Sequence, residues 1–192
     1  MSVTPVEICG FTSVEWNAAR PWLDYLAAVV DKRDIWESYT RRAQIEEESR
    51  CRLQDLPGKR RVLVLTAAWC GDAARSVPVL ATAFDAARGG VEHRYLDTDE
   101  HPEALDRYLT HGGRAVPLAI VQDEAGRTLG PWGPRPAPLQ ALLRARKREL
   151  GAPTPQTKGA WYAPLLAWYA KDGGTTAVQE ILMLLERGGE PR

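Results

Sequence analysis

The chain has 192 residues, 44% of them hydrophobic, and its 25 Lys and Arg residues balance 25 Asp and Glu residues, so its formal net charge is zero. Because neither sign of charge dominates, the composition argues against nucleic acid or an anionic membrane surface as a partner. The length suits one domain with extensions and is sufficient to bury a substantial core.

The sequence also indicates a compartment. Its first residues lack the basic segment and the apolar run of a secretory signal, and no stretch approaches the roughly 18 apolar residues that cross a bilayer. The three cysteines, Cys9, Cys51 and Cys70, are odd in number and far apart. This pattern argues against a disulfide framework. We therefore expect a cytoplasmic protein without membrane contact.

The N-terminal part of the chain carries helical patterns. Thr12 and Glu15 have the spacing of a capping box, in which each residue satisfies a main-chain amide of the other. Asp34 is a candidate N-cap for a later helix, whose charged second half extends to Arg50. We expect residues 1–56 to form an N-terminal helical extension.

Residues 57–150 alternate between strand and helix patterns. Apolar, β-favouring runs predict strands, and amphipathic segments between them predict helices. The expected strands cover residues 61–66, 91–96, 116–121 and 128–130. The continuous apolar run of the first is typical of a strand that is covered on both faces. This order predicts an α/β fold with a small central mixed sheet.

The last part of the chain, residues 151–192, predicts a C-terminal helical extension after a proline-containing linker. Its first helix carries large apolar residues at helical spacing, and Thr176 and Gln179 predict a capping box for its second. The two amphipathic helices can close an exposed flank of the sandwich or form a surface for a partner protein. In either case we expect the whole chain to form one compact unit.

Cys70 lies where the first predicted strand of the α/β region gives way to a helix. The amides at a helix N-terminus favour the thiolate form of a cysteine, whereas a neighbouring carboxylate such as Asp72 raises its pKa. Arg75, three residues further along the helix, is positioned to neutralise Asp72. These opposing effects leave the pKa of the thiol open.

Three motifs together resemble the thioredoxin superfamily over about half of the chain. Trp69-Cys70-Gly71 matches the start of its active-site motif, Pro78 matches the proline in its active-site helix, and Val116-Pro117 matches its cis-proline. The resemblance implies a thioredoxin-like three-layer sandwich with about four strands. The flanking helices look like a bacterial branch of the superfamily.

The resemblance also implies a substrate site. Around Cys70, the groove would be shaped by Trp69, Gly71, Asp72, Ala73, Val116 and Pro117. With a cis bond before Pro117, the main chain of Val116 would face the sulfur and pair with an extended peptide or a glutathione-like substrate. Arg114 and Arg135 would either bind a substrate carboxylate or form ion pairs within the protein.

The motif departs from the family at two places that matter for the mechanism. The second cysteine of the family is replaced by Ala73, so the chain lacks the thiol that resolves a mixed disulfide. The buried acid of the family falls near Val64, which cannot transfer a proton. Cys51 and Cys9 remain candidates for a resolving thiol.

The leading hypothesis is a monothiol thiol–disulfide oxidoreductase. Cys70 would attack a protein or low-molecular-weight disulfide, and an external thiol would resolve the mixed disulfide. This hypothesis requires Cys70 to be exposed enough to react. The alternatives are a non-catalytic binding module that uses the groove at Pro117, and a peroxide-reactive, redox-sensing cysteine.

The cysteines and histidines include no close pair of the kind that zinc sites use, so we expect neither a metal nor another cofactor.

Overall fold

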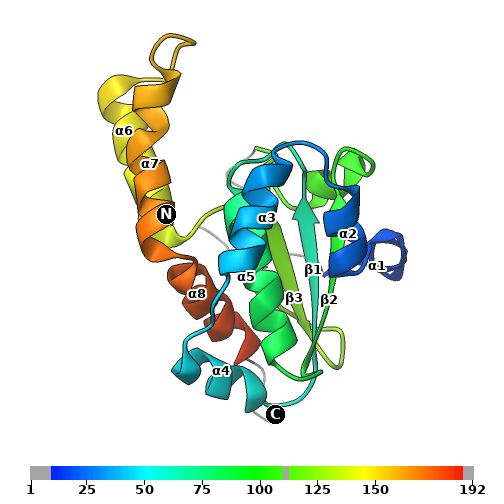
Figure 1. The fold of residues 1–192 in the computed structure, drawn as a ribbon. Coiled ribbons are helices and arrows are strands. Elements are labelled where there is room, and N and C mark those ends of the chain that lie inside the picture. The colour runs from blue at the N-terminus through cyan, green and yellow to red at the C-terminus, as the bar shows by residue number, and fades with distance from the viewer. Residues whose placement is uncertain (1–9, 110–112, 188–192) are drawn as a thin grey trace, which may run out of the picture.

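The computed structural model describes residues 10–109 and 113–187, and Figure 1 shows its fold. These residues form eight α-helices, one 3-10 helix and four strands. In chain order the elements are α1 (Ser13–Ala18), α2 (Trp22–Ala28), α3 (Arg33–Arg42), α4 (Glu47–Gln54), β1 (Arg60–Thr66), α5 (Ala73–Ala86), β2 (Val91–Asp97), the 3-10 helix η1 (Pro102–Arg107), β3 (Leu118–Asp123), β4 (Thr128–Trp132), α6 (Ala137–Leu150), α7 (Lys158–Asp172) and α8 (Thr175–Leu185). The predicted α/β class, with a four-stranded mixed sheet and helices added at both ends, is confirmed.

The sheet places β1 at its centre. Its strand order is β2-β1-β3-β4, with β1 parallel to β2 and antiparallel to β3, and β3 antiparallel to β4. All but one of the seven residues of β1 are buried, as its continuous apolar run predicts. Leu65 lies opposite Leu118. The turn after β1 and the segment before β3 therefore meet at the same end of the sheet.

Both edges of the sheet contact other parts of the chain. At the β2 edge, Arg20 and Tyr95 exchange two main-chain hydrogen bonds of 2.9 and 2.8 Å. At the β4 edge, α8 packs against the strand, and the Arg187 guanidinium donates a hydrogen bond to the main-chain oxygen of Leu129.

Two features of the N-terminal helices differ from the sequence-based expectation. The capping box of Thr12 and Glu15 is present. However, Asp34 is not an N-cap, because α3 begins directly after Lys32, whose φ of 52° is left-handed. The single helix expected up to Arg50 is interrupted, because the chain leaves the helix after Arg42 and buries Ile45 in the core before α4 begins.

The C-terminal helices separate into two parts. α8 packs against α5 and β4, and it contributes apolar side chains such as Ile181 and Leu182 to the main core. α6 and α7 instead pair with each other and project away from the sheet (Figure 1). We call this pair, residues 137–172, the arm. The buried side chains of its own apolar cluster are Leu139, Trp161, Leu165 and Tyr169.

The start of α8 is not capped as predicted. The residue before the helix is Gly174, which has no side chain that could cap it. Thr176 binds the carboxylate of Asp172 instead of forming a capping box with Gln179. Gly174 has a left-handed φ of 96°, and a Cβ atom there would lie 2.6 Å from the Val79 side chain of α5. The turn between α7 and α8 is therefore packed directly onto α5.

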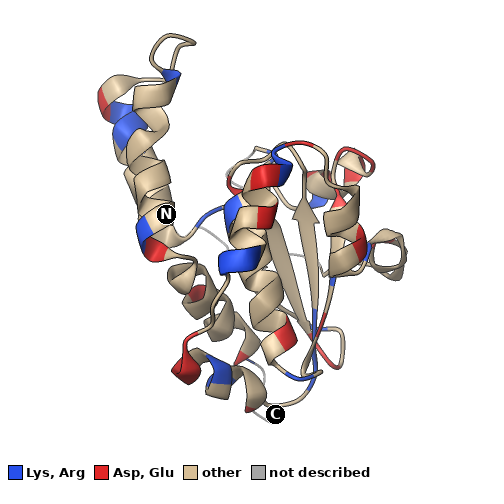
Figure 2. Cartoon of the chain, viewed as in Figure 1, with Lys and Arg blue, Asp and Glu red and all other residues tan. Residues whose placement is uncertain are grey.

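Charges of both signs are distributed over the helices, as Figure 2 shows, and neither sign gathers in one region in this view. No helix in the described part of the chain is long and apolar enough to cross a membrane.

Candidate functional site around Cys70

Cys70 lies in the short turn that joins β1 to α5. The main-chain amide of Cys70 donates to the oxygen of Ala67 over 3.1 Å, and the oxygen of Cys70 accepts from the amide of Ala74 over 3.0 Å. The latter bond brings Cys70 into the first turn of α5. As a result, the amide of Ala73 lies 3.5 Å from the Cys70 sulfur and points its N–H at it.

The segment before β3 lies against the same sulfur. The Cys70 thiol donates to the main-chain oxygen of Val116, with 3.3 Å between sulfur and oxygen. The peptide bond between Val116 and Pro117 is cis. The pairing of β1 with β3 thus brings the sulfur together with Val116, which lies 46 residues away in sequence.

The thiol is buried, with only 8% of the residue exposed. This exposure is lower than the hypothesis of a reactive Cys70 thiol predicts. Burial raises the pKa of Cys70 above its ordinary value. The amide of Ala73 acts in the opposite direction, the charge of Asp72 adds to the increase, and Arg135 counteracts it more weakly. At neutral pH the thiol is therefore mostly protonated, as its hydrogen bond to Val116 requires.

The Asp72 carboxylate is bound by two residues that come after β4 in the chain, and it does not pair with Arg75. One carboxylate oxygen of Asp72 lies 2.5 Å from the guanidinium of Arg135, in the loop between β4 and α6. The other accepts a 2.9 Å hydrogen bond from the hydroxyl of Tyr169, on α7 of the arm. The guanidinium of Arg75 instead donates to the main-chain oxygen of Gly71 over 2.7 Å. Tyr169 was not among the site residues expected from the sequence, where it formed part of an apolar helical stripe.

Trp69 is half-exposed beside the buried thiol. Its indole N–H donates to a carboxylate oxygen of Asp99 over 3.1 Å, and its main-chain oxygen accepts from the ammonium group of Lys32. The adjacent oxygen of Ala68 accepts from the indole of Trp36, which is fully buried. Contacts from α3 and from the loop after β2 therefore fix the turn that carries Cys70.

The remaining residues of the expected groove occupy different environments. Ala73 is fully buried, and a Cβ atom at Gly71 would lie 3.1 Å from the guanidinium of Arg75. Arg114 is exposed and forms an ion pair of 2.5 Å with Asp106 of η1. Of the two arginines expected at the groove, Arg135 therefore contacts the Trp-Cys-Gly-Asp motif, through Asp72, and Arg114 pairs with another carboxylate.

The loop that carries Arg135 lies directly against Pro117. Gly133 has a φ of 126°, and a Cβ atom there would lie 2.2 Å from the main-chain oxygen of Pro117. Only glycine fits this contact. Pro117 and Arg135 were both expected near the site, but the sequence did not indicate that Gly133 packs against Pro117. The contact is between main chains, which no side-chain pattern indicates.

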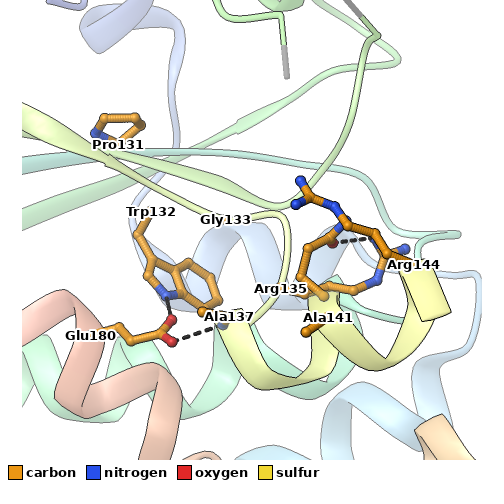
Figure 3. Close-up of a pocket in the computed structure, with 9 residues that line it drawn as sticks. Pro131, Trp132, Gly133, Arg135, Ala137, Ala141, Arg144 and Glu180 are labelled. Carbon is orange, nitrogen blue, oxygen red and sulfur yellow. Dashed lines mark hydrogen bonds between the residues drawn. The ribbon is translucent and has the colours of Figure 1, made fainter. Parts of the chain in front are cut away.

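Beyond Gly133 the loop borders a cavity of about 330 Å³ between the end of β4, α6 and α8, shown in Figure 3. Glu180 of α8 holds one side of it: its carboxylate accepts from the indole N–H of Trp132 and from the amide of Ala137, each over 2.8 Å. The full lining is Pro131, Trp132, Gly133, Arg135, Ala137, Gln140, Ala141, Arg144 and Glu180. Arg135 thus belongs both to the cavity wall and to the pair with Asp72.

The candidate resolving thiols are not found beside Cys70. Cys51 is exposed on α4, and Gln54, three residues further along the same helix, donates to the oxygen of Ala86 at the C-terminal end of α5. Cys70 precedes the other end of this helix, which has 14 residues and is therefore roughly 20 Å long. Cys9 lies outside the described residues.

Comparisons with known proteins agree with the fold described above. A family model described as thioredoxin matches residues 21–149, about two thirds of the chain. No curated protein sequence is significantly similar to the chain. A solved structure of a protein of unknown function from Pseudomonas aeruginosa superposes with a TM-score of 0.68 at 21% identity, covering 92% of this chain and 98% of that one. An HIV epitope-scaffold superposes with a TM-score of 0.71 at 16% identity and the same two coverages. At these identities, the structural similarity establishes a shared fold.

Proposed function

The chain belongs to the thioredoxin family, and on this basis we propose that it is a monothiol thiol–disulfide exchange protein, in which Cys70 forms a mixed disulfide that an external thiol resolves. The observation that carries the proposal is the placement of the Cys70 sulfur. It lies 3.5 Å from the amide of Ala73, at the start of a helix, and 3.3 Å from the oxygen of Val116, next to Pro117. A helix N-terminus stabilises the negative charge that a reacting thiol develops.

The first step of the proposed reaction consumes a disulfide. The Cys70 thiol loses its proton, and the thiolate attacks one sulfur of a disulfide R–S–S–R′. A bond forms between Cys70 and the R sulfur, the original S–S bond breaks, and R′–S⁻ leaves and takes up a proton. Cys70 is thereby oxidised to a mixed disulfide, and R′–SH is the reduced product.

The second step requires a thiol from outside the motif, because Ala73 stands where a resolving cysteine would be. An external thiolate R″–S⁻ attacks the R sulfur of the mixed disulfide and releases the Cys70 thiolate, which regains a proton. The products are R–S–S–R″ and the original thiol, so electrons balance over the cycle. The proposed partners are a protein or low-molecular-weight disulfide and a small thiol, and the proposed setting is a reducing compartment such as the cytoplasm.

The raised pKa of Cys70 slows this chemistry without abolishing it. Each unit of increase lowers the thiolate fraction at neutral pH tenfold, but it raises the nucleophilicity of the remaining thiolate by about threefold. The net loss of rate is therefore only about threefold to fourfold per unit. A high pKa also makes Cys70 a poor leaving group, so we expect its mixed disulfide to persist.

A second candidate function is a binding module of the thioredoxin fold that does no chemistry. The burial of Cys70 favours it, because the thiol is protonated and engaged with Val116. In this case Trp69, which is half-exposed, and the segment at Pro117 would hold a partner noncovalently.

The organisation that accompanies the proposal is a thioredoxin-like core within residues 57–150, between helical extensions of residues 1–56 and 151–192. The last helix of that range, α6, pairs with α7 in the arm. The contact of Tyr169 with Asp72 supports one compact unit, because it joins the C-terminal extension to the turn that carries the thiol.

Trapping of mixed disulfides separates the two candidate functions. The wild-type protein, Cys70→Ser and Cys51→Ser are each incubated with a neutral small disulfide such as hydroxyethyl disulfide, and adducts are located by peptide mass spectrometry. We expect a reductant-sensitive adduct at Cys70 in the wild type and in Cys51→Ser, and none at position 70 in Cys70→Ser. A folded wild-type protein that forms no adduct at Cys70, even at pH 9, would contradict the exchange mechanism.

A further inference from the structure

The carboxylate of Asp72, two residues after the thiol, is held by two elements that lie outside its own helix. Arg135 comes from the loop after β4, and Tyr169 comes from α7 of the arm. Asp72 and Arg135 are each only about one fifth exposed at the side chain, and Tyr169 is almost completely buried. This pair of contacts is therefore fixed by packing and is largely shielded from solvent.

We propose that Arg135 and Tyr169 are positioning residues of the Cys70 site, which hold the Asp72 carboxylate in a neutralised and fixed orientation and thereby keep Cys70 reactive. This inference rests on the proposed exchange function, since it concerns the reactivity of the same thiol. It goes further in assigning a chemical role to the arm, through Tyr169.

Arg135 contributes through its charge. An unneutralised carboxylate next to a thiol disfavours the thiolate by like-charge repulsion, and a guanidinium in contact with that carboxylate cancels most of this repulsion. The guanidinium also favours the thiolate directly, although more weakly than Asp72 opposes it. A second hydrogen bond, from Arg135 to the side-chain oxygen of Gln140 over 3.2 Å, holds the guanidinium in place.

Tyr169 contributes through its hydroxyl. Burial raises the pKa of Tyr169 far above its ordinary value, and the neighbouring Asp72 raises it further, so the hydroxyl remains a donor over the accessible pH range. The guanidinium of Arg75 lies 5.9 Å from the centre of the Tyr169 ring, on the same helix as Asp72. The donated hydrogen bond disperses part of the carboxylate charge and directs that oxygen toward the arm.

The other groups near Cys70 do not replace this pair. Tyr25 of α2 is close enough to interact with Cys70, but burial raises its pKa, so it is neutral when the thiol titrates. Lys32 and Asp99 face the neighbouring Trp69, where they bind its main-chain oxygen and its indole. Asp72 and Arg135 are thus the charged side chains with the largest electrostatic effect on the Cys70 thiol, and the guanidinium of Arg75 is bound to the neighbouring main-chain oxygen of Gly71.

The test is the pH dependence of alkylation at Cys70, followed on its own peptide with iodoacetamide. Five proteins are compared: the wild type, Asp72→Asn, Tyr169→Phe, the double variant of these two, and Tyr162→Phe. Tyr162 is a matched control, because it lies on the same helix, seven residues before Tyr169, and its ring packs against that of Trp161. Thermal unfolding of each protein verifies that it is folded.

We expect Asp72→Asn to shift the midpoint of alkylation down by about 0.5 to 1 pH unit, the effect of removing one charge several ångströms away in a partly solvated site. Tyr169→Phe should shift it up by roughly 0.3 unit, because the carboxylate then keeps more of its charge. In the Asp72→Asn background, Tyr169→Phe should not shift the midpoint, since the neutral amide can still accept the hydrogen bond but carries no charge for the hydroxyl to disperse. Tyr162→Phe should match the wild type.

Equal shifts from Tyr169→Phe with and without Asp72 would overturn the proposal, because they would indicate general loosening of the fold. An unchanged midpoint in Tyr169→Phe would overturn the role of the arm. If Tyr169→Phe does not fold, Arg135→Gln takes its place, with an expected upward shift that an unchanged midpoint would contradict. The exchange function is tested separately, since alkylation reports the thiol whether or not a mixed disulfide forms.

Discussion

The Cys70 thiol donates a hydrogen bond to the main-chain oxygen of Val116, with 3.3 Å between sulfur and oxygen. This bond requires the protonated thiol, whereas the amide of Ala73 at 3.5 Å favours the thiolate. The two contacts lie on the same sulfur and have opposite preferences. Deprotonation therefore removes the hydrogen bond to Val116 and strengthens the one from Ala73.

The first prediction concerns the reactivity of this thiol in the wild-type protein. Because burial raises the pKa of Cys70, we expect its alkylation to be slow at pH 7 and still rising above pH 8.5, the ordinary range for a cysteine. Cys51, which is exposed, serves as the internal reference on the same chain. Site-resolved mass spectrometry after timed iodoacetamide treatment measures both rates. A Cys70 rate that levels off below pH 8 would contradict the prediction.

The second prediction concerns Gly133. A Cβ atom at this position would lie 2.2 Å from the oxygen of Pro117, at a φ of 126°. We expect Gly133→Ala to lower the free energy of unfolding by about 2–4 kcal/mol, from steric overlap and backbone strain together. Gly126→Ala is the matched control, because its φ is also positive, at 79°, but nothing lies within 4 Å of the added methyl group. Urea denaturation measures the free energy of unfolding of both variants. Equal decreases in the two variants would show that the contact with Pro117 does not contribute to stability.

The third prediction concerns His93, a largely buried residue of β2. Its ring nitrogens lie 2.9 Å from the Tyr95 hydroxyl and 3.1 Å from a carboxylate oxygen of Asp85. Burial lowers the pKa of His93, and Asp85 opposes this effect without overcoming it. The unfolded chain therefore binds a proton near pH 6.5 that the folded protein does not yet bind. We expect the free energy of unfolding to fall as the pH drops below about 6.5, with a slope of at most about 1.4 kcal/mol per pH unit from this group.

His93→Gln provides the control for this pH dependence. The variant removes the titrating group, so its free energy of unfolding should change less between pH 6.5 and pH 5 than that of the wild type. Chemical denaturation at several pH values measures the slopes. Parallel slopes for the two proteins would assign the pH dependence to other residues.

The fourth prediction concerns Cys51 as a resolving thiol. Cys51 lies on α4, which contacts the C-terminal end of α5, whereas Cys70 precedes the N-terminal end of that helix, about 20 Å away. A disulfide requires Cα atoms within about 7 Å. We expect mild oxidation with diamide to give no intrachain disulfide between Cys51 and Cys70. Peptide mapping under non-reducing conditions detects such a linkage, and finding it in the folded monomer would refute the separation described above.

The sequence predicted the elements whose signals are local. The apolar run of β1 and the capping box of Thr12 and Glu15 depend on residues a few positions apart, and both were found. The helix start at Asp34 was wrong because Lys32 adopts a left-handed conformation that its residue type does not indicate. The capping box at Thr176 was wrong because α8 begins at Thr175, so Thr176 lies inside the helix and its hydroxyl donates to Asp172.

The candidate site was predictable in its position but only partly in its chemistry. The motif around Cys70 indicated the turn and the helix. The largest influence on its pKa, burial, depends on how the whole chain packs and has no local signature. The partner of Asp72 was expected three residues away, at Arg75, but it is Arg135, 63 positions further along the chain. Tyr169, 97 positions away, resembled any other aromatic residue of an apolar stripe.

The coverage of the two sheet edges also limits how this protein can associate. An exposed edge strand is a template on which another chain can add a strand, and it is a common origin of aggregation. Here Arg20 pairs with Tyr95 on one edge, and α8 packs along β4 on the other. Strand addition at β2 would compete with the main-chain pairing of Arg20 with Tyr95, and strand addition at β4 would have to displace α8. Destabilising the contacts of α8 with β4 should therefore favour association through β4.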